Sequence, residues 1–220
     1  AVLYEPRTKV VIERMDLSDP GFGEVLIKMM SSGVCHSDWH VVKGEWNHLP
    51  LPIILGHEGS GIVEAVGPNV QHVKVGDHVI LSWRANCGAC DMCMQGWPAL
   101  CKDQKPLSQN PRVSKTGEEI NPMAGVGTFS TYQVVPQAAA IPIDKDIPFP
   151  QASLVGCGVT TGVGAVISTA RVKPGSSVAV FGAGGVGQEL INQLRFRAFD
   201  RAGTVLVSTI ILVFFIDTVS

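Results

Sequence analysis

The sequence has no excess of charge of either sign. Its 220 residues include 17 Lys and Arg against 19 Asp and Glu, which gives a formal net charge of −2. Because no broad positive field is available to hold a phosphate backbone, nucleic-acid binding driven by net charge is disfavoured. Charged residues make up only 16% of the chain and apolar residues 45%, which is unlike the composition of a disordered protein. We therefore expect one large domain or two small ones, each with a buried core.

The sequence also lacks a recognisable leader and a full-length membrane span. Its opening residues, AVLYEPRTKVVIERM, contain no basic stretch followed by an apolar one, so we expect a cytoplasmic protein. The one membrane-like run, TVLVSTIILVFFI at 204–216, is shorter than the roughly 20 residues that a spanning helix needs. Its β-branched and aromatic residues favour a buried strand over a tail anchor, and no membrane partner is expected.

The first 150 residues are typical of a β-rich domain. Strand-like runs at 24–29, 61–66, 77–81 and 131–135 are separated by Gly, Pro, Asn and Asp. Frequent turn residues between such runs favour an irregular β-barrel or sandwich with long functional loops. We therefore predict an irregular β-barrel or sandwich domain over residues 1–150.

The pattern changes after residue 150. Residues 151–171 are small and apolar, which indicates a closely packed helical connector that extends to the Lys173-Pro174-Gly175 turn. The run 177–181 shows no polar alternation, as expected of a parallel strand covered on both faces. A glycine turn, a helix over 188–201 and a second strand over 204–216 complete one βαβ unit. The predicted fold class is mixed α/β, with a connector at 151–174 and a partial dinucleotide-binding domain at 175–220.

Four of the six cysteines form a compact cluster. They follow the spacing C-x2-C-x2-C-x7-C in NCGACDMCMQGWPALC, and such spacers let thiolates from one loop converge on one tetrahedral ion. Disulfides are the alternative for an even cysteine count, but they need an oxidising compartment. We predict a structural zinc site in a lobe at residues 83–105, with four ligands: Cys87, Cys90, Cys93 and Cys101.

The other two cysteines, Cys35 and Cys157, stand alone in the sequence. Each could be no more than a small buried apolar residue. Between them lies the segment GHEG, which contains His57. Two thiolates and one imidazole are the three ligands of a catalytic zinc that keeps its fourth position open. Spacing alone cannot assemble this site, so both interpretations stay open at this point.

Together these motifs resemble the zinc-dependent, medium-chain alcohol dehydrogenases. The matching motifs are G-V-C-H-S-D-x-H, G-H-E-x-x-G, G-D-H-V, C-x2-C-x2-C-x7-C, G-C-G-x-x-T-G and G-x-G-x-x-G, in the order of the family. The match covers the chain to about Gly187, and the segment through GVGTFSTYQVV resembles the branch with formaldehyde and aryl-alcohol dehydrogenases. The resemblance implies a GroES-like catalytic domain followed by a Rossmann domain, two zinc ions per chain and NAD, with NADP not excluded.

The resemblance also implies a role for each matched residue. Cys35, His57 and Cys157 would hold the catalytic zinc, with Glu58 beside the metal and Asp38 orienting the histidine. Ser37 would hydrogen-bond the alcohol oxygen, and His40 would pass the proton to solvent. The alternative for these two is a helix cap and a solvated surface histidine.

Cofactor and pocket residues follow from the same resemblance. The cofactor would contact His36, Thr161, Gly182, Gly184, Gly185, Val186 and Gly187. A G-x-G-x-x-G motif is weak by itself, but this one follows an apolar strand and opens a helix, as its mechanism requires. Trp46 and Trp83 fall at substrate-pocket positions, and ordinary core or loop anchoring is the alternative for both.

The sequence departs from the family in its last part. Only 46 residues run from Gly175 to Ser220, whereas a dinucleotide-binding domain takes on the order of 100–150. The acidic residue expected about 20 positions after the glycines is missing, since that region reads Leu206, Val207, Ser208. If these residues are the whole chain, we expect zinc binding, weak NAD binding, poor turnover and association through the apolar segment 204–216.

Three functions follow as hypotheses. The first is a zinc-dependent alcohol dehydrogenase that acts on a small-molecule alcohol or aldehyde with NAD(P)+, as a homodimer or homotetramer. The second is a zinc-stabilised interaction module without catalysis, although its lobe mixes Lys and Arg with Asp and carries no basic patch. The third is a zinc-free reductase of the same superfamily, which the full set of ligands contradicts. Metal content separates the three: two zinc ions, one or none.

Overall fold

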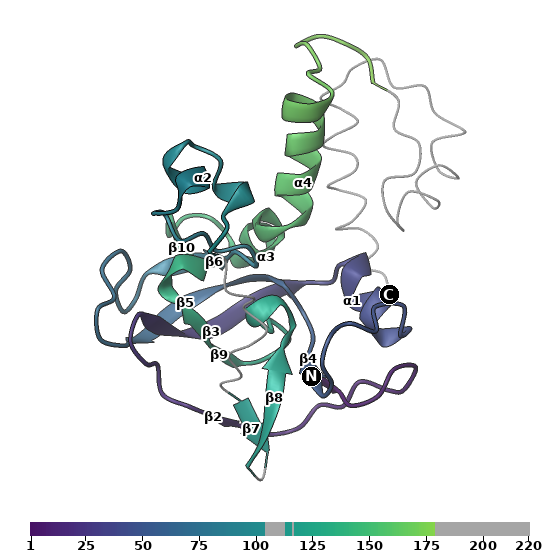
Figure 1. Cartoon of the computed structure of the whole chain (residues 1–220), viewed down its shortest axis with the longest axis vertical. Coiled ribbons are helices and arrows are strands. Elements are labelled where there is room, and N and C mark those ends of the chain that lie inside the picture. The colour runs from purple at the N-terminus through teal and green to yellow at the C-terminus, as the bar shows by residue number, and fades with distance from the viewer. Residues whose placement is uncertain (104–112, 116, 179–220) are drawn as a thin grey trace. The chain divides into compact units, whose positions relative to one another are not determined.

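The computed structural model describes residues 1–103, 113–115 and 117–178 (Figure 1). The chain divides into two compact units, Ala1–Gly158 and Val159–Ser220, and the candidate metal ligands all belong to the first. In the described residues, no single helix is long and apolar enough to cross a membrane, although Phe149–Gly156 and Gly158–Thr169 pass that test when taken as a bent pair.

A five-stranded antiparallel sheet forms the larger part of the first unit. Its strand order is β10-β6-β5-β3-β9, and every neighbouring pair is antiparallel. The strands are β3 (Glu24–Gly33), β5 (Glu58–Val66), β6 (His78–Leu81), β9 (Tyr132–Pro136) and β10 (Ala140–Ile143). The longest strand, β3, pairs with both β5 and β9, so its C-terminal end fixes the position of the residues that follow it.

A second five-stranded sheet consists of short strands. Its order is β1-β4-β8-β7-β2, with β4 and β8 parallel and the other pairs antiparallel. The strands are β1 (Val2–Leu3), β2 (Asp16–Leu17), β4 (Ile53–Ile54), β7 (Val113–Lys115) and β8 (Glu118–Pro122).

The core of the larger sheet follows from the alternation of side chains along its strands. Val25 and Ile27 of β3 are fully buried and pack with Val63 of β5 and Val135 of β9. Each such side chain contributes about 1.5–3 kcal/mol through its removal from water. The backbones of β3 and β5 approach so closely at Gly61 that an added Cβ would lie 2.3 Å from a carbonyl oxygen of β3.

The helices of the described residues are short. They are α1 (His36–Val42), α2 (Asp91–Met94), α3 (Phe149–Ser153) and α4 (Gly158–Gly164). Single 3-10 turns are η1 (Pro98–Leu100), η3 (Met123–Gly125), η4 (Gln137–Ala139) and η5 (Leu154–Gly156), and η6 (Ala165–Thr169) is a π-helical turn. Of these, α3 and η5 contact the larger sheet, where both lie against β5 and β6.

The described structure confirms the predicted mixed α/β class with a β-rich first part. The four predicted strands are found as β3, β5, β6 and β9, and β3 extends to Gly33, beyond the predicted end at 29. The connector is helical as predicted, but its residues from Val155 to Ala170 are half-buried or exposed rather than closely packed. The βαβ unit lies almost entirely outside the described residues, and the predicted domain boundaries stay a prediction.

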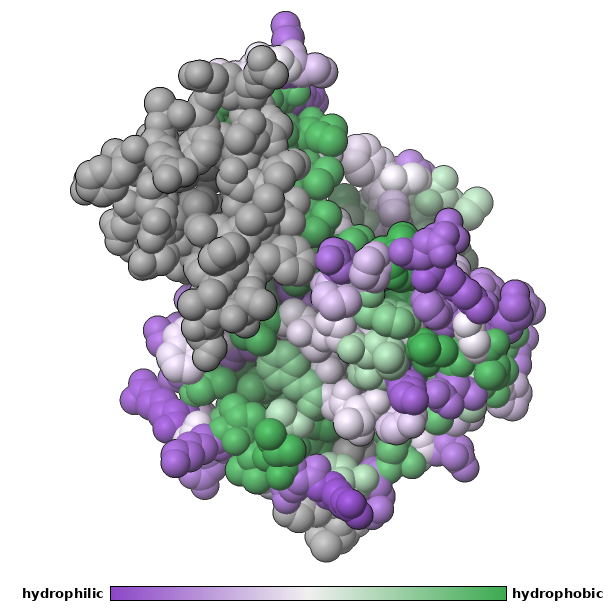
Figure 2. Space-filling view, turned by 180° about the vertical axis from the view of Figure 1, so that it is seen from behind, coloured by the Kyte–Doolittle hydropathy of each residue, from purple (hydrophilic) through white to green (hydrophobic). Residues whose placement is uncertain are grey.

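Large apolar side chains also lie on the surface. Ile12, Phe22 and Met94 are 90%, 76% and 76% exposed, and the view in Figure 2 shows apolar residues gathered among polar ones on one face. The buried core therefore accounts for only part of the apolar composition.

Candidate metal centres

Cys35 stands at the junction between β3 and α1. The strand ends at Gly33, and Cys35 is the N-cap of α1, with an extended backbone at φ −100° and ψ 154°. Asp38, in the first turn, accepts a hydrogen bond from the Cys35 N–H through Oδ2 at 2.9 Å. This local bond satisfies one free N–H at the helix start and fixes the cysteine backbone.

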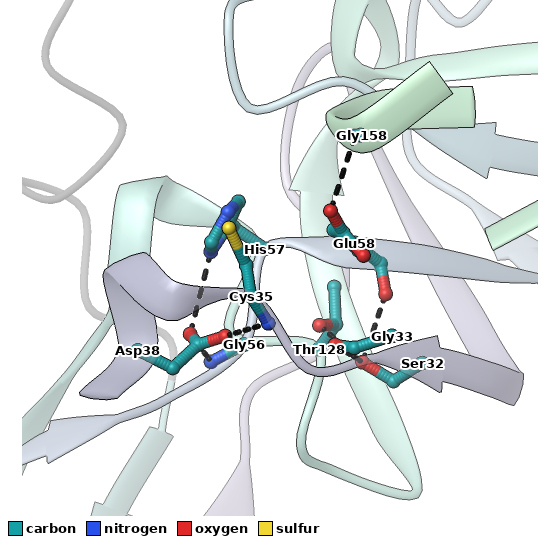
Figure 3. Close-up of polar contacts among 9 residues, drawn as sticks. All are labelled: Ser32, Gly33, Cys35, Asp38, Gly56, His57, Glu58, Thr128 and Gly158. Atoms are coloured by element: carbon teal, nitrogen blue, oxygen red, sulfur yellow. Dashed lines mark hydrogen bonds and ion pairs between the residues drawn. The ribbon is translucent and has the colours of Figure 1, made fainter. Parts of the chain in front are cut away.

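The same Asp38 carboxylate fixes His57 (Figure 3). Its Oδ1 accepts the Gly56 N–H at 3.0 Å and lies 3.3 Å from His57 Nδ1. Because Asp38 and His57 are both buried and Nδ1 is engaged, Nε2 of His57 is left to act as a metal ligand.

Glycine is required next to the histidine. Gly56 has φ +89°, and an added Cβ would lie 2.5 Å from both Thr128 Oγ1 and Phe129 Cδ1. A residue with a side chain would therefore move His57 away from Asp38.

Cys157, from a distant part of the chain, joins Cys35, His57 and Glu58 in a first cluster of possible metal ligands. The ligand atoms of Cys35, His57, Glu58 and Cys157 all lie within 4.8 Å of one another. Gly156 allows the approach, since an added Cβ would lie 2.4 Å from the Leu81 carbonyl oxygen. Three separate segments thus meet at one point.

Glu58 is, with His57, one of the two buried members of this cluster. Its Oε1 accepts the Gly158 N–H at 3.1 Å (Figure 3), and only 4% of the residue is exposed. Gly33 leaves room for the carboxylate, because an added Cβ would lie 2.2 Å from Glu58 Oε2. Burial raises the pKa of Glu58, and the nearby Cys35 thiolate raises it further.

The thiol and imidazole groups of the cluster have strongly shifted pKa values. A hydrogen bond from Cys157 is the largest of several that lower the pKa of Cys35 to about 3, against the effect of burial, while the Cys157 pKa is raised. Burial opposes ionisation of His57, but hydrogen bonds with Asp38 and Cys35 prevail and raise its pKa to about 10. The cluster therefore stabilises thiolate charge, and two cysteines with an anchored imidazole fit the donor set of a zinc ion.

The second cluster holds the four cysteines of the predicted lobe. Their sulfur atoms all lie within 4.8 Å of one another, with Sγ–Sγ distances of 3.9 Å for Cys87–Cys93 and for Cys90–Cys101. A tetrahedron of zinc–sulfur bonds of about 2.3 Å has edges of about 3.8 Å. These sulfur positions fit a closed tetrahedral zinc site.

Backbone amides of the lobe point at its sulfur atoms. The N–H groups of Ala89 and Cys90 donate to Cys87 Sγ at 3.4 and 3.2 Å, and the Cys87 N–H donates to Cys101 Sγ at 3.3 Å. Backbone hydrogen bonds from Cys93 and Lys102 lower the pKa of Cys90 to about 6. The local fold therefore favours thiolates, which are the metal-binding form of cysteine.

The predicted relay residues both lie in α1, Ser37 in its first turn and His40 in its last. Ser37 lies two residues after Cys35, whereas His40 contacts His36, with 3.1 Å between His40 Nε2 and His36 Nδ1. His40 Nδ1 contacts Glu45. Within residues 1–103, no direct hydrogen bond joins Ser37 to His40.

The two predicted pocket tryptophans have different surroundings. The Trp83 ring meets the His57 ring edge-on with centroids 6.5 Å apart, so it lies beside the first cluster. The Trp46 ring stacks on His40 at 5.5 Å and packs against a core cluster that includes Leu3.

Of the predicted cofactor residues, the structure describes only His36 and Thr161. Thr161 lies in α4, in the second unit. The others lie outside the described residues: Gly182, Gly184, Gly185, Val186 and Gly187.

Glu45, which contacts His40, was not among the residues predicted from the sequence. Its signal is the order V-K-G-E after an amphipathic helix, where the glycine predicts a turn that returns the next residue to the helix end.

The chain is similar to several known proteins. The family model for the alcohol dehydrogenase GroES-like domain matches residues 21–145. Alcohol dehydrogenase B of Mycobacterium tuberculosis is 40% identical over 194 residues, which cover 85% of this chain and 52% of that protein. The S-(hydroxymethyl)glutathione dehydrogenase of Escherichia coli is 40% identical over 202 residues, covering 89% of this chain and 55% of the enzyme.

A similar structure has been solved. The crystal structure of benzyl alcohol dehydrogenase from Acinetobacter calcoaceticus superimposes with a TM-score of 0.73 at 36% identity, over 85% of this chain and 52% of that one. The chain spans about half the length of the curated relatives that it matches.

Proposed function

The chain belongs to the alcohol dehydrogenase family with a GroES-like domain, within the medium-chain dehydrogenase superfamily. We therefore propose that it acts as a zinc-dependent alcohol dehydrogenase. The reaction is oxidation of an alcohol to an aldehyde or ketone, with NAD(P)+ as hydride acceptor. The observation that carries this proposal is the meeting of Cys35, His57 and Cys157, from three distant segments, within 4.8 Å.

Cys35, His57 and Cys157 would hold the catalytic zinc. Zinc bound there supplies a Lewis acid that lowers the pKa of an alcohol hydroxyl. Asp38 holds His57 by Nδ1, so that the ligand nitrogen stays aimed at the cluster. Glu58 adds a buried carboxylate at the edge of the site.

Ser37 and His40 would carry the proton away from the alcohol. Ser37 lies in the first turn of α1, two residues after Cys35, and its hydroxyl can both donate and accept a hydrogen bond. The His40 side chain is 34% exposed, so it can exchange a proton with solvent. No direct bond joins these two residues in residues 1–103, so the substrate, the cofactor or a water molecule would have to bridge them.

NAD(P) would supply the hydride acceptor. His36 and Thr161 are the described residues that we propose for contact with it, together with the glycine fingerprint at 182–187. We propose a small-molecule alcohol or aldehyde as substrate, and Trp83 beside His57 offers an apolar wall that favours an aromatic or aliphatic group. A cytoplasmic homodimer or homotetramer remains our proposal for the assembly.

Cys87, Cys90, Cys93 and Cys101 would hold the structural zinc. Four sulfur ligands leave no open position on the ion, so this lobe would take no part in the reaction. Its role would be to hold an exposed loop in one conformation.

Metal content tests the proposal. We expect two zinc ions per chain by plasma mass spectrometry, and alcohol-dependent reduction of NAD(P)+ by absorbance. Cys157→Ala should lose one zinc ion and all activity. The paired control Cys101→Ala should lose the other zinc ion.

Specific results would contradict the proposal. One zinc ion in the wild-type chain, unchanged by Cys157→Ala, would favour the zinc-stabilised interaction module. Two zinc ions without oxidation of any primary, aromatic or hydroxymethyl-thiol alcohol would refute the dehydrogenase.

A further inference from the structure

The end of α1 folds Glu45 back onto His40. The Gly44 N–H donates to the Val41 carbonyl at 2.9 Å, and the Glu45 N–H donates to the His40 carbonyl at 2.9 Å. These two bonds form a Schellman motif, with Gly44 at φ +70° as its left-handed residue. Glu45 therefore contacts His40 twice, through its backbone N–H to the His40 carbonyl and through its carboxylate to the His40 ring.

Three groups hold the His40 ring. Glu45 Oε2 hydrogen-bonds Nδ1, and the Trp46 ring stacks on the imidazole at 5.5 Å with 10° between the planes. On the other side, Nε2 lies 3.1 Å from His36 Nδ1. The edge, the face and the second nitrogen of the imidazole are each engaged.

This arrangement selects one tautomer of His40. An ionised carboxylate only accepts hydrogen bonds, so the Nδ1 that faces Glu45 must carry the proton. Nε2 of neutral His40 then carries the lone pair, and His36 Nδ1 donates to it. The basic nitrogen of His40 thus faces His36, next to Cys35 in the chain.

We propose that Glu45 is a positioning residue for proton exit, which holds His40 with Nε2 as the inward acceptor and Nδ1 as the outward donor. The proposal rests on the proposed function, since it deepens the role of His40. A proton taken up at Nε2 is balanced by release of the Nδ1 proton to the Glu45 carboxylate, which passes it to water. Glu45, with 46% of its side chain exposed, is the solvent end of this path.

A surface ion pair is the competing explanation of the contact. Lys43 Nζ lies 3.7 Å from Glu45 Oε1, on the other oxygen of the carboxylate. If Glu45 serves only that pair, loss of Lys43 and loss of Glu45 should have equal effects. Lys43→Gln is therefore the matched control.

The first test measures the tautomer of His40 by long-range proton–nitrogen NMR. The sample is the zinc-loaded full chain with labelled histidine, and His40→Gln assigns the signal. We expect the Nδ1–H form in the wild type, in Lys43→Gln and in the conservative variant Glu45→Asp. Glu45→Ala should shift the ring toward the Nε2–H form. An Nε2–H wild type, or no change in Glu45→Ala, would overturn the proposal.

The second test measures alcohol oxidation at neutral pH. Glu45→Ala should lower kcat about tenfold, a modest part of the 10²–10⁴ that positioned acid–base groups supply, and added imidazole should restore it. Lys43→Gln should keep the wild-type rate. An unchanged kcat in Glu45→Ala, or a loss that imidazole does not restore, would count against proton exit through His40. An inactive wild type would refute the proposed function, while the NMR result decides the orientation of His40 independently.

Discussion

At the scale of single residues, Asp38 links the two halves of the candidate catalytic site. Its carboxylate accepts from the Cys35 N–H, from the Gly56 N–H and from His57 Nδ1. All three bonds are made inside the fold, where an unmatched polar group is costly. Asp38 therefore fixes the positions of two candidate zinc ligands, Cys35 and His57, without being a ligand itself.

Asp38→Asn should weaken zinc binding at the Cys35–His57–Cys157 cluster by about 10–100-fold, as is typical when a partner of a metal-bound histidine is lost. The neutral amide keeps the size of the carboxylate but can no longer accept three hydrogen bonds as well. Competition with a chelator measures the affinity, and the four-cysteine lobe provides an internal control. If the zinc affinity of the Cys35–His57–Cys157 cluster were the same in Asp38→Asn as in the wild type, this role of Asp38 would be contradicted.

At the scale of elements, the four-cysteine lobe has little core of its own. The helix α2 contains no buried residue, and Met94, Trp97 and Leu100 are 76%, 61% and 57% exposed. The lobe therefore depends on its sulfur cluster rather than on apolar burial, in contrast to β3 and β5.

Cys93→Ser, or removal of metal, should unfold the lobe and leave the sheets intact. We expect faster amide hydrogen exchange in residues 87–101 and unchanged exchange in β3 and β5, because metal binding and folding are coupled in such sites. Mass spectrometry of exchanged peptides measures both regions in one experiment. Protection that persists in the metal-free lobe would show that other contacts hold it.

The Schellman motif of α1 gives a second prediction at this scale. Gly44→Ala should destabilise the chain by about 1–2 kcal/mol, because a side chain costs about that much in the left-handed region. The added Cβ would also lie 2.8 Å from Pro6 Cβ. Gly162→Ala, inside α4 with nothing within 4 Å, is the control and should not destabilise. Urea unfolding measures both, and equal effects would contradict the explanation.

At the scale of the whole molecule, the sequence predicts secondary-structure elements better than it predicts contacts between distant segments. Alternating apolar residues and turn residues were enough to predict β3, β5, β6 and β9, because their signals are local. The lobe could also be predicted, since its cysteines lie within 15 residues of sequence. Residues 35, 57 and 157 were joined only by family resemblance, because no local pattern encodes a contact across 100 residues. Glu45 was missed because a helix-end turn, not a motif, brings it to His40.

The difference between the two clusters should appear in global stability. A metal ion that joins Cys35, His57 and Cys157 links the start of α1, the start of β5 and the end of η5, whereas the lobe ion links one loop. Zinc at about 1,000 times its dissociation constant should therefore raise the free energy of unfolding by about 4 kcal/mol. Urea unfolding followed by circular dichroism should show this increase in the wild type and in Cys93→Ser, and lose most of it in Cys157→Ala. If Cys157→Ala responded to zinc as the wild type does, the three segments would not be joined by a shared ion.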